Sequence, residues 1–238
     1  MPDQGVTRLY IVLAALAILS LAPPLLAGRQ RWDALPPARR VFWWYLLFAL
    51  VTGVMAFIFD RLGIPRHFAD RATVPVETGI LLLAFAAWQV DAAAATLLET
   101  LAPLCILFWI PPMVGWERSD GFSLWLEPAQ AILCLAAATY TVVRRAVARL
   151  APAGQEDWFW IGSGVMLYMG VWALTNPVLV YLEPREERLA DAVLAVRAGA
   201  SLLGNLLIFH GMRCPTSLPN SGHSFFRPRS SGGFSWWR

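Results

Sequence analysis

Seven blocks of apolar residues, each close to the length needed to cross a bilayer, fill most of this chain. A transmembrane α-helix needs about 20 consecutive, mostly apolar residues. Every backbone polar group in hydrocarbon must bond within the protein, so only helices and closed barrels can span it. The chain is therefore expected to be all-α, a polytopic bundle of seven transmembrane helices. The blocks cover residues 9–27, 41–59, 74–88, 93–114, 122–143, 158–181 and 189–212.

The composition supports a membrane protein without a separate soluble domain. The chain is 58% hydrophobic and 15% charged, whereas a soluble domain is about 25% charged. We expect residues 1–214 to form the helix bundle and residues 215–238, rich in Ser, Gly, Pro and Arg, to be a disordered tail. The formal net charge is only +3, which gives no support to a nucleic-acid partner. The expected partner is the lipid bilayer.

Two features leave the number of helices open. Only residues 89–92 separate the third block from the fourth, so failure of the turn there would give six helices. The block 9–27 could instead be a cleaved signal peptide. Only Arg8 precedes that block as a basic residue, and the block is long for such a signal, which favours a helix.

The basic residues predict the orientation of the chain. All 19 are arginines, because the sequence contains no lysine. With the N-terminus outside, eleven arginines lie on the cytoplasmic side and seven on the outer side, with Arg197 inside the membrane. Cytoplasmic loops carry an excess of basic residues. We therefore expect a multi-pass protein of the cell (inner or plasma) membrane, N-terminus out and C-terminus in. The aromatic runs 43–45 and 158–160 are expected at the cytoplasmic interface.

The sequence assigns no catalytic residue, metal or cofactor. Without lysine there is no Schiff base, and Cys105, Cys134 and Cys214 lack the spacing of a zinc site or a disulfide framework. Ser163 stands between two glycines, as in part of the serine motif of rhomboid proteases, and His210 could pair with it. Close packing of helices explains the two glycines more simply.

Arg197 is the residue that most needs a partner. A charge at the bilayer centre costs about 2.5–3.5 kcal/mol on insertion scales, so it should face the bundle. The positions that share its helix face are small or polar, namely Ala200, Ser201, Gly204 and Asn205, and the other face is rich in leucine. Asn205 on this stripe is expected to bond across helices.

Three glutamates are candidate partners of Arg197. Glu77 and Glu127 should lie in the same leaflet as Arg197, and Asn176 joins them from the sixth block, whereas Glu99 should lie nearer the cytoplasmic side. Arg197, Glu77, Glu127 and Asn176 are therefore the predicted ligand-binding residues. The alternative is structural: a buried Arg–Glu pair, with Glu77 and Glu127 stabilising helix starts.

This cluster predicts a protein that binds a small molecule or an ion in an outer-leaflet polar pocket, as a transporter or a sensor. Arg197 would hold an anionic group or keep a carboxylate charged. An intramembrane hydrolase and a structural or assembly subunit of a membrane complex are the alternatives.

Three short runs carry a resemblance to a known group. They are DWFWIGSGVMLY at 157–168, TVPVE at 73–77 and MRC at 212–214. Together they resemble uncharacterised bacterial seven-helix integral membrane proteins of about this size. The resemblance would cover residues 5–214; it implies the architecture and brings no activity with it.

Overall fold

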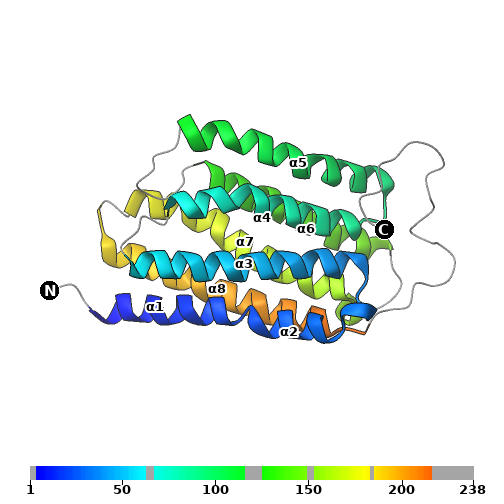
Figure 1. The fold of residues 1–238 in the computed structure, drawn as a ribbon, viewed down its shortest axis with the longest axis horizontal. Coiled ribbons are helices and arrows are strands. Elements are labelled where there is room, and N and C mark those ends of the chain that lie inside the picture. The colour runs from blue at the N-terminus through cyan, green and yellow to red at the C-terminus, as the bar shows by residue number, and fades with distance from the viewer. Residues whose placement is uncertain (1–3, 63–66, 116–124, 149–152, 183–184, 216–238) are drawn as a thin grey trace.

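The computed structural model describes residues 4–62, 67–115, 125–148, 153–182 and 185–215. Within these residues every regular element is a helix, and from α3 onward each long helix runs opposite to the one before it (Figure 1). We call the end where α1 begins the N-terminal end and the opposite end the far end. The elements are α1 Gln4–Leu19, α2 Ala22–Gln30, the 3₁₀ turn η1 Trp32–Ala34, α3 Pro37–Arg61, α4 His67–Ala87, α5 Ala92–Gly115, α6 Leu126–Ala148, the 3₁₀ turn η2 Ala153–Gln155, α7 Asp157–Leu182 and α8 Glu187–Arg213.

Six helical stretches of the described chain are long and apolar enough to cross a membrane. One of them, Leu9–Gln30, joins α1 to α2, and the apolar part of α4, Ala72–Ala87, is shorter. The turn expected at residues 89–92 forms, since α4 ends at Ala87 and α5 begins at Ala92. These helices support a multi-pass membrane protein, and seven spans remain a prediction.

The first apolar block forms one candidate span, Leu9–Gln30, and this span contains a break between α1 and α2. α1 ends at Leu19, and α2 starts beyond a turn at Ser20. The dipeptide Pro23–Pro24 near the start of α2 has no N–H to offer the preceding turn. Asn205 of α8 donates a hydrogen bond of 2.8 Å from Nδ2 to Oγ of Ser20. The break is therefore tethered to α8, which confirms that Asn205 bonds across helices.

Helix α4 begins earlier than its hydropathy indicates. We expected residues 74–88, but α4 begins at His67, ahead of a polar stretch, and Pro75 lies inside it. Glu77 consequently sits in the third turn, so a role in stabilising the helix start is wrong for this residue. Residues 122–124 of the fifth block, and the tail from residue 216, lie outside the described part of the chain.

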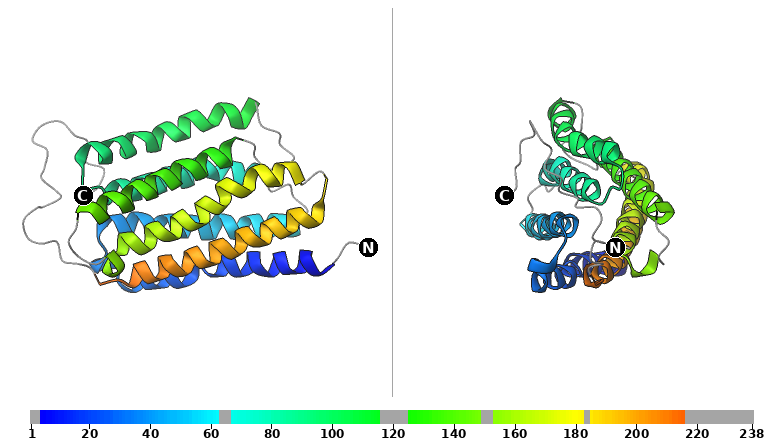
Figure 2. Two further views of the ribbon diagram at one scale, coloured as in Figure 1. Left: turned by 180° about the vertical axis from the view of Figure 1, so that it is seen from behind. Right: turned by 90° about the vertical axis from the view of Figure 1, so that its right-hand side faces the viewer.

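The helices form a ring with one helix outside it. α3 and α4 face α6, α7 and α8, and the pair α1–α2 packs on α8 (Figure 2). α4 contacts α6 directly, and α5 packs mainly on the outer side of α4. Six long helices thus surround a common interior, and α5 has a large uncovered face.

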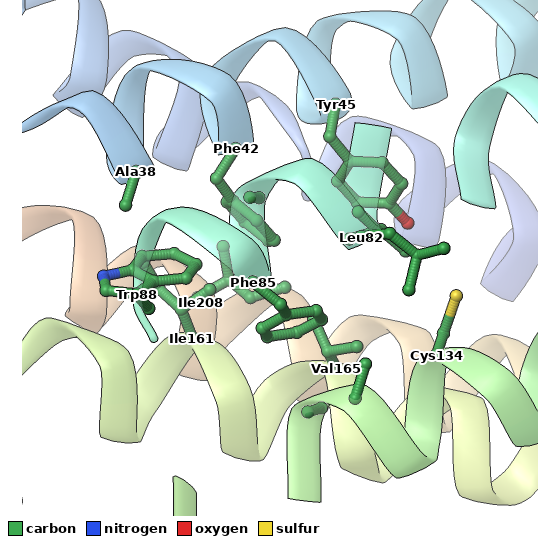
Figure 3. Packing of buried hydrophobic residues seen from close by; sticks show 14 of the residues in the cluster. Ala38, Phe42, Tyr45, Leu82, Phe85, Trp88, Cys134, Ile161, Val165 and Ile208 are labelled. Carbon is green, nitrogen blue, oxygen red and sulfur yellow. The ribbon is translucent and has the colours of Figure 1, made fainter. Parts of the chain in front are cut away.

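An apolar core fills the far half of the ring. Phe42 of α3 and Phe85 of α4 point toward Ile161 and Val165 of α7, with Ile208 of α8 beside them (Figure 3). All five side chains are buried. Glu77, Glu127 and Arg197 lie beyond this packing, in the half nearer the N-terminal end.

Glycines bring α7 and α8 into backbone contact. A Cβ on Gly164 would lie 2.6 Å from the carbonyl oxygen of Gly204, so only glycine fits there. No hydrogen bond joins Ser163 to His210 in the described residues, and the His210 ring packs against Trp160 with centroids 4.6 Å apart. The structure therefore supports the packing interpretation of these glycines.

A buried ion pair closes the far end beside Cys214. Arg39 Nε donates to Oδ2 of Asp157 at 2.5 Å, and its Nη1 donates to the Cys214 carbonyl at 2.9 Å. Burial raises the pKa of the Cys214 thiol, although Arg39 acts in the opposite direction. These contacts tie the end of α8 to the starts of α3 and α7.

Candidate functional site

A cavity of about 350 Å³ lies inside the ring, from its middle toward the N-terminal end. Side chains of α1, α3, α4, α6, α7 and α8 line it, and α5 contributes none of the described lining residues. Its charged lining residues, among those described, are Glu77, Glu127 and Arg197. Three of the four residues predicted as ligand-binding therefore meet at one cavity.

Arg197 is held between an acid and an aromatic ring. Its Nη2 lies 3.6 Å from Oε2 of Glu127, and its guanidinium carbon stands 3.8 Å from the centroid of the Trp172 ring. Both charged side chains are nearly buried, with 7% and 12% exposed for Arg197 and Glu127. Of the three acids considered from the sequence, Glu127 is the ion-pair partner, and the ring adds a cation–π contact.

Asn176 supports this pair from behind. Its Nδ2 donates to Oε2 of Glu127 at 2.9 Å, and the residue is fully buried. It is absent from the described lining of the cavity, so its place is beside the ion pair and not on the cavity wall. Its Oδ1 has no hydrogen-bond partner in the described structure. An unsatisfied buried acceptor is destabilising, whereas the Nδ2 group of the same side chain bonds to the Glu127 carboxylate.

Glu77 lies on the other side of the cavity, where two neutral side chains come close to its carboxylate. Oγ1 of Thr52 and Nε2 of Gln130 each approach one of its carboxylate oxygens at 3.4 Å. Gln130 is one turn beyond Glu127 on α6, so this helix contributes to both carboxylates. The two acids are thereby linked through α6.

The cavity floor is made of two tyrosines. The hydroxyl groups of Tyr45 on α3 and Tyr168 on α7 are hydrogen-bonded to each other, and both residues line the cavity. Small and apolar residues of α1 and α3, such as Ala14 and Ala49, form one wall. A ligand would therefore meet a polar side and an apolar side.

Several of these residues were not found from the sequence. Tyr45 ends an aromatic run expected at the membrane interface, but it is buried, and so is Trp158 of the second run. Thr52 and Trp172 could not be identified as site residues from the sequence pattern, since each is an isolated residue in an apolar helix. Gln130 follows Glu127 by three positions, which puts the two on one helix face, and both line the cavity.

Glu99, the third acid considered, lies away from the cavity. It belongs to α5, which contributes no described lining residue, and its side chain is exposed.

The chemistry available in the cavity is binding by charge, hydrogen bonds and apolar contact. No group of three or more His, Cys, Asp or Glu side chains capable of holding a metal ion occurs among the described residues. Comparisons of the chain with protein-family models, with curated proteins and with solved structures found no match. Function has to follow from the geometry of the cavity.

Proposed function

We propose that this chain is a multi-pass integral membrane protein that binds a small molecule or an ion in the cavity beside Glu77, Glu127 and Arg197, as a transporter or a sensor. The observation that carries the proposal is the convergence of these three charged residues, from three helices, on one cavity. Ligand sites are concave and mostly apolar, with a few converging polar groups. The orientation with the N-terminus outside places this cavity in the outer leaflet.

The contacts of Arg197 favour a ligand that is cationic or donates hydrogen bonds. The guanidinium lies between Glu127 and Trp172, so its positive charge is already engaged by groups of the protein. Among the described lining residues there are two carboxylates and one guanidinium, so an added anion meets a net negative lining. Glu77 is the group at which we place the positive or donating end of the ligand.

The apolar wall favours a ligand with an organic body over a bare inorganic ion. Ala14 and Ala49 leave space beside the polar groups, and burying apolar ligand surface there contributes about 25 cal/mol per Å². An amine on a small hydrocarbon skeleton matches both sides of the cavity.

The test is thermal stability of the purified protein in detergent with benzylamine, benzyl alcohol and benzoate, which share one skeleton and differ in charge. A ligand that binds only the folded state adds about 2.7 kcal/mol at 100 times its Kd. Benzylamine should raise the melting temperature most and benzoate least. Equal or larger stabilisation by benzoate would contradict the cationic class, and no shift with any of the three would contradict this ligand class for the cavity.

A variant pair separates the cavity from general charge effects. Glu77→Gln should abolish the preference for benzylamine while the protein stays folded. Asp33→Asn removes a carboxylate from an exposed position in η1, outside the described lining of the cavity, and should leave the preference unchanged. Equal effects of the two substitutions would count against a site at Glu77.

The sequence runs 73–77, 157–168 and 212–214 support a further part of the proposal. We place the chain with the uncharacterised seven-helix membrane proteins that it resembles, in a bacterial inner membrane.

A further inference from the structure

Helix α5 carries polar groups on its uncovered face. Leu98, Ala102 and Cys105 are buried against the bundle, whereas Thr96 and Glu99 are exposed. Thr96 lies three positions before Glu99, so the two share a helix face. No hydrogen bond or ion pair within the described structure engages the Glu99 carboxyl group.

The depth of Glu99 makes this exposure costly in the proposed membrane. It lies two turns beyond Ala92, the first residue of α5, which is about 10 Å along the helix axis. An acidic side chain inside the hydrocarbon costs about 2.5–3.5 kcal/mol at the helix centre and is normally paired or turned to the protein interior. Here the bundle offers no partner among its described residues.

A second acceptor lies at the same height. Pro103 has no N–H, so the backbone carbonyl of Glu99 lacks the hydrogen bond that residue 103 would donate in a regular helix. Pro103 is itself exposed, as is Thr100. The hydroxyl of Thr100 bonds back to the Thr96 carbonyl at 2.7 Å. The uncovered face of α5 therefore presents a carboxyl group and a free carbonyl, flanked by short side chains that allow another helix to approach.

We propose that this face binds a second copy of the chain, with α5 packed against α5 of the partner around Glu99. All copies insert with one topology, so a two-fold axis along the membrane normal makes the two α5 helices parallel. Glu99 of one copy then meets Glu99 of the other at equal depth, as an isologous interface requires. A neutral carboxyl group both donates and accepts, so the two can pair with each other and with the free carbonyls. An unrelated partner would need a matching polar group at that depth, whereas a second copy supplies it automatically.

The dimer is independent of what the cavity binds. The α5 face lies outside the described lining residues of the cavity, so loss of ligand binding and loss of pairing are separate results. The first experiment counts subunits of the full-length protein in lipid vesicles by single-molecule photobleaching, over a range of protein-to-lipid ratios. Wild type should be dimeric, and Glu99→Leu should associate about tenfold more weakly. Glu99→Gln, which can still donate and accept, should retain most of the pairing.

Site-directed crosslinking tests the face itself. Thr96→Cys should give a covalent dimer with a short bis-maleimide in vesicles. Val196→Cys, exposed on the distant helix α8, should give no more than wild type, whose own cysteines are buried. The melting temperature of Glu99→Leu should stay within a few degrees of wild type, because no contact inside the described bundle is lost.

Three results would overturn the inference. The first is a wild-type protein that is monomeric at every protein-to-lipid ratio. That result would also be obtained if a different protein or lipid headgroups cover the α5 face, and it would overturn the dimer in either case. The second is Glu99→Leu pairing as strongly as wild type. The third is crosslinking at residue 196 that equals crosslinking at residue 96.

Discussion

Replacing Arg197 by methionine removes the guanidinium from between Glu127 and Trp172 and leaves a flexible apolar side chain in its place. Removing one partner of a buried ion pair costs about 3–5 kcal/mol, because the other charge is left uncompensated. The lost cation–π contact costs up to about 2 kcal/mol when desolvated. The N–O distance of 3.6 Å is long for a charged hydrogen bond, so the ion-pair loss belongs at the low end. We expect a total loss of at least about 3 kcal/mol.

This loss should be visible as a shift in thermal unfolding of the purified protein in detergent. For a chain of this length, about 3 kcal/mol corresponds to roughly 6–12 °C by the scaling for soluble domains. Adding Glu127→Gln to Arg197→Met should restore more than half of the loss, since the buried charge is gone and the amide still accepts from Asn176. Val196→Met, next to Arg197 but 59% exposed, is the control and should shift the midpoint by less than about 2 °C.

Two results would refute this account of Arg197. One is a loss for Arg197→Met no larger than for Val196→Met, which would mean that the guanidinium contributes no stability at this place. The other is a double variant whose loss equals the sum of the single losses, because independent sites add and coupled charges do not.

Three further predictions follow from packing and topology. Gly164→Ala should cost about 1–3 kcal/mol because its Cβ meets the backbone of α8, whereas Gly170→Ala, with open space around it, should leave the midpoint of thermal unfolding unchanged or slightly raised. Ala49→Leu should fill the cavity and abolish stabilisation by benzylamine while thermal stability stays at or above wild type; loss of both would point to misfolding. Glu186→Cys at the N-terminal end should react with a membrane-impermeant maleimide in intact cells and Gln30→Cys at the far end only after permeabilisation; the reverse pattern would overturn the orientation.

Hydropathy predicted most of the helices because the membrane sets their length, but it did not locate their ends. The break at Ser20 lies inside a segment that is apolar on average over its whole length, and it arises from the Pro23–Pro24 dipeptide that follows it. The start of α4 was missed for the opposite reason. His67 and the polar residues after it belong to a helix that is longer than its apolar stretch.

The site was predictable as a set of charges and not as a set of contacts. The cost of burying Arg197 implied an acidic partner, but the choice among three glutamates depends on which helices are neighbours. Glu127 is the partner because α6 lies beside α7 and faces the same interior as α8. A hydropathy pattern does not predict which helices are neighbours in space. Trp172 takes part for the same reason, since an isolated aromatic residue becomes a stacking surface only once a cation is placed over it.

The broken first span and the cavity belong to one arrangement. α1 forms a wall of the cavity, and Leu21 at the break lines it together with Tyr45 and Tyr168 of the floor. Beyond this level α2 packs on the far half of the bundle, which the apolar core fills. The hydrogen bond between Asn205 and Ser20 holds this break against α8. In the proposed transporter the two tyrosine hydroxyl groups that meet at the floor must part for a ligand to pass, so Tyr45→Phe, which removes one of them, should change the transport rate more than it changes stabilisation by benzylamine.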